Sequence, residues 1–230
     1  MRAMNNTAFL LSLIAPLFSH LKDEEYGQVL RNAAWQDVRA AAGDTAGAAL
    51  ALPAWPVRSS FQNELLMPGM PLAAMPVESL YKPWSSQEGN AFGATRGLYM
   101  GDAARHMSAL YRQLSIDVPA SFASMPDHLT LELELLSLVL EAGNEEAARQ
   151  LVHDHVDWLD DYDAALANRA DMVAHNGALI DQRRRTLLDG IAFLRALLAL
   201  VTSITRAILN ERTEAPHGCS NPVPLFHAGR

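Results

Sequence analysis

The sequence predicts an all-α protein, a helical bundle with two subdomains joined by a hinge. Apolar residues recur at helical spacing through most of the 230-residue chain. No run of alternating β-branched residues bounded by turn residues occurs. Half of the residues are hydrophobic, which is enough to bury a substantial core. Together these observations favour helices packed on helices.

The N-terminal subdomain, expected at 1–115, opens with an apolar run at residues 8–18. The run has the length of a signal-peptide core, but no small-x-small cleavage pattern follows it, so we expect a core helix instead. Asn5, Asn6 or Thr7 would cap this helix. Further helices are expected at 24–42, 59–66 and 102–114.

Residues 52–93 depart from the helical pattern outside the short 59–66 segment. Proline and glycine are frequent here, so we expect irregular chain. Long irregular segments inside compact proteins are usually functional or mobile. Met67, Met70 and Met75 are adaptable apolar side chains that would suit the wall of a binding groove.

Residues 116–125 show no clear period and are the expected hinge before a C-terminal subdomain at 126–212. The leucine-rich helix that follows would be covered on most sides, because leucines occupy two neighbouring stripes. We expect Ser124 to cap this helix and Pro126 to lie in its first turn.

The next helix is expected to begin at Asn144 and to carry one apolar stripe that runs from Ala147 to Leu166, with an acidic outer face. His155 and Trp158 share its apolar stripe. We expect His155 to be a packed, hydrogen-bonded histidine beside Trp158.

A last long helix is expected to begin after Gly177 and to fade by Asn210. Its apolar stretch is interrupted by Arg195 and falls short of the ~20 residues that a bilayer requires. We therefore expect no membrane insertion. The tail at 213–230 is rich in proline and glycine and should be loosely ordered.

The charge and the motif content exclude several functions. With 26 acidic and 18 basic residues, the chain lacks the basic face that a nucleic-acid binder needs. A single cysteine, Cys219, excludes a disulfide scaffold and favours a reducing compartment. No P-loop, dinucleotide-binding or G-x-S-x-G segment occurs. We expect no catalytic residues and no cofactor.

One alternative is a helical metal-dependent hydrolase or sensor that uses His153, Asp157 and Asp161. His153 and Asp157 stand at i, i+4 and would both reach one cation. A ligand set from one exposed helix lacks a third anchor for the ion. A solvent-facing acidic helix side explains the same residues without a metal. We therefore expect no metal there.

Four short segments carry a family resemblance. They are a first helix of the Leu-Leu-Ser-x-x-x-x-Leu-Phe type, Pro76-Val77-Glu78-Ser79-Leu80-Tyr81, Met125-Pro126-Asp127-His128-Leu129 with the Glu-x-Glu helix after it, and His155-Val156-Asp157-Trp158-Leu159. In this order the chain resembles the TorD/DmsD family of redox-enzyme maturation chaperones over roughly residues 8–210.

The resemblance implies a cytoplasmic, non-enzymatic chaperone with the helical-bundle fold of that family. Its partners would be the twin-arginine leader and the apo-form of a molybdopterin oxidoreductase catalytic subunit, and it would assist cofactor insertion before export. A NarJ-like chaperone of a non-exported molybdoenzyme is the alternative. The resemblance leaves open a monomer or a dimer that swaps subdomains. The leader-binding residues that it implies are Asp127, His128, Pro126, Glu78, Ser79, Tyr81 and Trp84.

Overall fold

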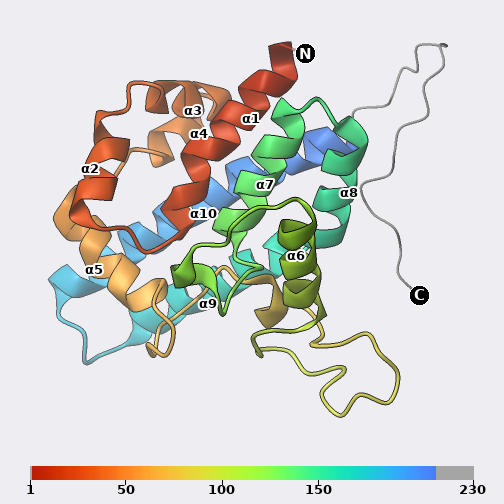
Figure 1. The fold of residues 1–230 in the computed structure, drawn as a ribbon. Helices are drawn as coiled ribbons and strands as arrows, with labels where there is room; N and C mark the ends of the chain where they lie inside the picture. Colours follow the sequence, from red (N-terminus) through yellow and green to blue (C-terminus); the bar gives the residue numbers. More distant parts are fainter. Residues whose placement is uncertain (1, 211–230) are drawn as a thin grey trace.

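The structure is a computed structural model that describes residues 2–210. Within these residues the regular elements are helices and no strand occurs, which confirms the predicted all-α class (Figure 1). The α-helices are α1 (Arg2–Ile14), α2 (Asp23–Arg31), α3 (Trp35–Ala42), α4 (Asp44–Ala49), α5 (Trp55–Leu65), α6 (Asp102–Gln113), α7 (Leu129–Glu141), α8 (Glu145–His155), α9 (Leu159–His175) and α10 (Asp181–Asn210). Short 3₁₀ segments are η1 (Ala15–Phe18), η2 (Glu78–Leu80) and η3 (Ala120–Phe122). The tail predicted at 213–230, including Cys219, lies outside the described residues.

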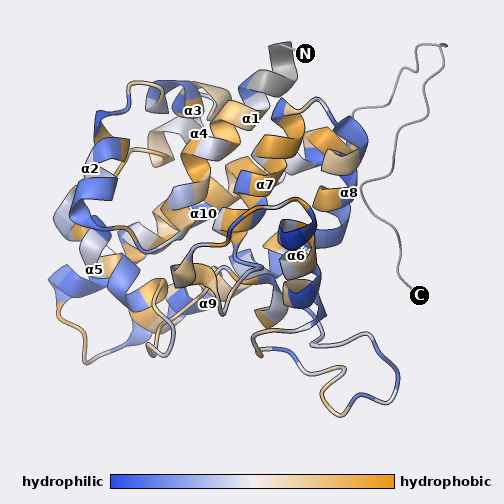
Figure 2. Ribbon diagram, viewed as in Figure 1, coloured by the Kyte–Doolittle hydropathy of each residue, from blue (hydrophilic) through white to orange (hydrophobic). Residues whose placement is uncertain are grey.

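Helix α7 is the central element, and it packs against α1, η1 and α8 (Figure 1). Most of its leucines are buried, as the two leucine stripes predict, and Figure 2 shows the helix as hydrophobic along most of its length. Two side-chain hydrogen bonds tie it to the N-terminal segment: Thr130 Oγ1 donates to Ala15 O (2.9 Å) and Ser137 Oγ donates to Ala8 O (2.8 Å). These bonds satisfy buried hydroxyls and fix the register of α7 against α1.

Helix α10 is 30 residues long and packs against α5, α8 and α9. By length and composition alone it is long enough to cross a membrane, contrary to the shorter apolar stretch expected from the sequence. Half of its most apolar window is buried inside the protein, as in a core helix. A Cβ atom at Gly190 would lie 2.3 Å from Phe61 Cγ, so glycine permits the close approach of α5 and α10.

The helix predicted at 24–42 is wrong in one respect, because it is divided into α2 and α3. At the break, the side chain of Asn32 accepts a hydrogen bond from Ala34 N (3.0 Å). An asparagine side chain can hydrogen-bond to a nearby backbone N–H in place of a helical hydrogen bond, and this favours a turn. Helix α4 was not predicted, because it lies directly after the end of the helix expected at 24–42.

The single helix predicted from Asn144 to Leu166 is also wrong, because α8 ends at His155 and α9 begins at Leu159. In a continuous helix the His155 carbonyl would accept from the backbone N–H one turn later. It accepts instead from the indole Nε1 of Trp158 (2.8 Å). The side chain thus satisfies the carbonyl and lets the chain turn.

Two predicted helix starts differ from the structure. Helix α1 begins at Arg2, so Asn5, Asn6 and Thr7 lie within it and do not cap it. Helix α7 is capped by His128, so Ser124 and Pro126 precede the helix.

The segment expected to be a hinge, 116–125, runs as irregular chain around η3. A single hydrophobic cluster includes residues from α1, α5, α7, α9 and α10, so elements on both sides of this segment share one core. The division into two subdomains and the hinge stay predictions.

Candidate functional site

The loop around η2 and the start of α7 form a joint, which we define by residues 77–79 and 127–128. Val77 and His128 make an isolated antiparallel bridge. Glu78 N donates to Asp127 O (3.0 Å). Two segments about fifty residues apart are therefore paired through their backbones, and two of the four sequence motifs that carried the family resemblance meet here.

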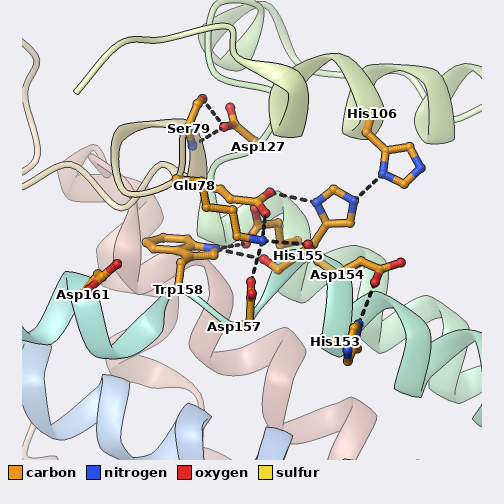
Figure 3. Close-up of polar contacts among 12 residues, drawn as sticks. Glu78, Ser79, His106, Asp127, His153, Asp154, His155, Asp157, Trp158 and Asp161 are labelled. Atoms are coloured by element: carbon orange, nitrogen blue, oxygen red, sulfur yellow. Dashed lines mark hydrogen bonds and ion pairs between the residues drawn. The ribbon is translucent and has the colours of Figure 1, made fainter. Parts of the chain in front are cut away.

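Asp127 closes this joint with its side chain, which is fully buried. Its Oδ2 atom accepts from Ser79 N (2.7 Å) and from the Ser79 hydroxyl (Figure 3). Its Oδ1 atom has no hydrogen-bond partner. Burial raises the pKa of Asp127 and outweighs the bonds from Ser79, which lower it, while Glu78 raises it further. Asp127 therefore acts as a clamp between the loop and α7, and Pro126 before it is buried as well.

His128 caps α7 from the same joint. Its Nδ1 atom accepts from Thr130 N (3.2 Å), which assigns the unprotonated nitrogen to that side of the ring. Burial lowers the pKa of His128 to about 3, so the ring is neutral at physiological pH. Phe122 packs edge-on against the ring at 4.9 Å between centroids.

Behind the joint, Glu78 anchors a buried charged cluster (Figure 3). Its two carboxylate oxygens contact Lys82 Nζ (2.7 Å) and His155 Nδ1 (2.7 Å). Lys82 Nζ also lies 2.5 Å from Asp157 Oδ1 and donates to Asp154 O (2.8 Å). Burial lowers the pKa of Lys82, but the two carboxylates outweigh this effect and raise it, so the lysine is charged.

Glu132 of α7 is the second carboxyl in this cluster and is fully buried. Its Oε2 atom accepts from Trp158 Nε1 (3.3 Å), and its Oε1 atom has no hydrogen-bond donor. Burial, followed by the negative charge of Glu78, raises the pKa of Glu132 well above its usual range. The buried environment of Glu132 therefore favours its protonated form.

His155 completes the cluster as a packed, hydrogen-bonded histidine, which confirms that expectation. Only 3% of its surface is exposed. While Nδ1 faces Glu78, Nε2 contacts His106 Nδ1 at 2.7 Å. Burial, followed by the neighbouring His155 ring, lowers the pKa of His106.

The two aromatic residues implied by the resemblance lie in different places. Tyr81 stacks on Trp158, with 5.2 Å between centroids and 11° between planes, and donates from its hydroxyl to Met75 O (3.0 Å). Trp84 donates to a different part of the loop, Tyr99 O (3.0 Å), and Arg105 covers its ring. Tyr81 thus packs beside the cluster through Trp158, whereas Trp84 contacts Tyr99 and Arg105.

A groove lies on the other side of the joint, where His128 forms part of its wall. The groove has a volume of about 430 Å³. Its apolar lining is Pro16, Leu21, Leu66, Met67, Pro68, Met75, Phe122 and Met125, and its polar lining is Ser19, His20, Glu25, Ser121, His128, Thr130 and Glu134. Of the three methionines expected to line a groove, Met67 and Met75 do so; Met70 is not in its lining and is 37% exposed.

Glu25 and Glu134 are exposed at this groove. Glu25 accepts from Lys22 N (2.7 Å) as part of a helix cap. Within residues 2–210 neither carboxylate forms an ion pair, so both are available to a cationic ligand.

The residues of the alternative metal hypothesis are held in separate contacts. His153 is exposed and bonded to Asp154 (2.8 Å), Asp157 is held by Lys82, and Asp161 pairs with Arg96 (3.0 Å). In the described part of the chain, the group whose potential ligand atoms converge is a different one: Glu78, Glu132 and His155.

Sequence reasoning missed Lys82, Glu132 and His106 as site residues. The signal for Glu132 was present, because a glutamate between Leu131 and Leu133 on a helix covered from most sides must be buried. Lys82 and His106 gave no comparable signal, since Asp157 and His155, which they contact in the folded protein, lie far away in the sequence.

Comparison with known families addresses the identity of the chain. No curated protein matches it. The family model described as nitrate reductase delta subunit matches residues 28–171, well over half of the chain. The matched segment contains the joint and the cluster behind it. The chain therefore belongs to the nitrate reductase delta subunit family, a family of redox-enzyme maturation chaperones.

Proposed function

We propose that this protein is a chaperone that binds the twin-arginine leader of a molybdopterin-containing oxidoreductase subunit and assists cofactor insertion and assembly before export. Its family supports the coarser part, a non-enzymatic role in molybdoenzyme assembly. The groove beside α7 supports the more specific part, which is binding of a twin-arginine leader, as the resemblance to the TorD/DmsD branch implies.

The groove has the chemistry that such a leader requires. A twin-arginine leader carries two arginines followed by an apolar, helix-prone stretch. Met67, Met75 and Met125 offer adaptable apolar contacts, as methionines do in proteins that take up varied helices. Glu25 and Glu134 provide carboxylates without ion-pair partners within residues 2–210, which suit the guanidinium groups. A volume of about 430 Å³ accommodates a few side chains, not a whole helix.

The joint supports the groove from behind in this proposal. Asp127 and Glu78 are fully buried, so in this conformation they do not contact a leader. They hold the loop against the start of α7, and His128 and Met75 on that framework line the groove. Asp127 and Glu78 would then affect leader binding through the position of the groove wall.

Calorimetric titration with a synthetic twin-arginine leader tests the proposal. We expect binding at tens of micromolar or tighter, and a leader with both arginines changed to glutamine should bind at least tenfold more weakly. Glu134→Gln should weaken binding about three- to tenfold, the effect of one charge-assisted pair. Glu141→Gln, an exposed site on the same helix and outside the groove, should bind as wild type. No heat would refute leader binding, and equal affinity for both peptides would refute recognition of the arginine pair.

A NarJ-like chaperone of a non-exported molybdoenzyme is the second candidate, favoured by the family description itself. The same groove would then take an apolar N-terminal segment without an arginine pair. Binding of such a segment that is unaffected by Glu134→Gln but weakened by Met67→Ala would favour this candidate.

A further inference from the structure

The buried cluster behind the joint has features that leader binding does not use. Glu78, Glu132 and His155 come from η2, α7 and α8, and none is more than 3% exposed. Their potential ligand atoms lie within 4.8 Å of one another. We propose that Glu78, Glu132 and His155 form a binding site for one divalent transition-metal ion, with Zn²⁺ as the best fit.

The geometry permits such an ion after small shifts. Three atoms within 4.8 Å of one another leave a point at most about 2.8 Å from each. Zinc bonds to imidazole nitrogen and carboxylate oxygen are about 2.0–2.2 Å long, so each ligand must move by less than about 1 Å. One imidazole and two carboxylates are a borderline donor set that suits Zn²⁺ better than the all-oxygen sites of Mg²⁺ or Ca²⁺.

The charge balance points the same way. Glu78 and Asp157 already share the single ammonium group of Lys82. Glu132 is left with a fully buried Oε1 atom that no donor reaches. A Glu132 carboxylate oxygen lies within 4.8 Å of one from Glu78, and two ionised carboxylates are both acceptors, so this pair needs a proton or a metal ion between its members. A divalent ion displaces the proton of Glu132 and satisfies both carboxylates.

The surroundings orient the ligands as they do in known metal centres. His155 presents Nδ1 to the cluster while its Nε2 contacts His106 Nδ1 at 2.7 Å, the outer hydrogen bond that fixes a ligating imidazole. Trp158 Nε1 holds the other oxygen of Glu132. Lys82 holds one oxygen of Glu78 and leaves the second one facing His155. A bound ion would link the loop to α7 and α8.

Titration of the full chain, purified without an affinity tag and stripped with EDTA, tests the site. Calorimetry with ZnCl₂ at pH 7 should give one ion per chain. Glu132→Gln should weaken binding at least tenfold. This variant should fold, because glutamine has the shape of the protonated glutamate and still accepts from Trp158. If its circular dichroism nevertheless shows misfolding, His155→Ala replaces it as the ligand variant.

Two control variants distinguish Zn²⁺ binding at this site from binding by the single cysteine or by an exposed histidine. His153→Ala, at an exposed histidine, and Cys219→Ser should bind Zn²⁺ as wild type does. Co²⁺ added to the wild-type protein should give visible absorption bands that Zn²⁺ removes. Less than half an equivalent of bound Zn²⁺, undiminished binding by a folded Glu132→Gln or His155→Ala variant, or loss of binding in either control would overturn the proposal.

Discussion

Replacement of Glu132 by glutamine should change how stability depends on pH in the metal-free protein. Burial and the neighbouring Glu78 raise the pKa of Glu132 well above its usual range of about 4.5. A carboxyl with a raised pKa in the folded state contributes stability that is fully present below its unfolded pKa. That stability is lost as the pH rises toward the folded pKa. Glutamine cannot ionise, so the variant should lack this loss.

The magnitude follows from linkage. While the unfolded chain is ionised at position 132 and the folded protein is not, wild type loses about 1.4 kcal/mol of unfolding free energy per pH unit relative to the variant. Between pH 5 and pH 7 the difference between the two proteins should therefore change in favour of Glu132→Gln, by at most about 3 kcal/mol. The site is fully buried, so solvent does not screen this effect.

Urea unfolding followed by far-UV circular dichroism, with EDTA present and at half-unit steps of pH, measures the difference directly. Equal slopes against urea for the two proteins would show that the unfolded states are comparable. Glu141→Gln, an exposed change on the same helix, is the control and should run parallel to wild type. If Glu132→Gln also runs parallel to wild type across this range, the assignment of a buried proton to Glu132 is refuted.

Three further results are expected. Asp127→Ala should lower the free energy of unfolding by about 2–4 kcal/mol, because it leaves the buried Ser79 N–H and hydroxyl without their charged acceptor, and urea titration measures this. Gly190→Ala should lower it by about 1–3 kcal/mol, since the added Cβ atom overlaps Phe61; a variant as stable as wild type would contradict the close approach of α5 and α10. In leader titrations, Asp127→Asn should weaken binding, whereas Asp160→Asn, at a highly exposed carboxylate, should leave the affinity unchanged.

The fold could be predicted from the sequence wherever the apolar period is long. The leucine stripes of α7 and the apolar face of α10 identified both helices, because burial of such stripes dominates local preference. The errors occur where one polar side chain redirects the backbone. Asn32 and Trp158 each form a hydrogen bond with a nearby backbone group and divide a helix that the apolar period alone extends.

The candidate site could be predicted only in part. The motif residues Glu78, Ser79, Asp127 and His128 do meet in the structure, although their binding role stays a prediction. Their partners could not be found in the same way, because the Lys82–Asp157 and His155–His106 pairs join elements far apart in sequence. No local pattern specifies which of many charged residues a folded chain brings together.

Because Asp127 is buried, its substitution should affect leader binding indirectly. The family resemblance implied that Asp127 is a leader-binding residue, yet its carboxylate is fully buried and bonded to Ser79. The next residue, His128, forms part of the groove wall, so loosening the Asp127 clamp would move that wall. An indirect effect predicts that Ser79→Ala weakens leader binding nearly as much as Asp127→Asn does, because both changes weaken the same clamp. A direct effect predicts that only the aspartate change matters, so comparing these two affinities distinguishes a positioning residue from a contact residue.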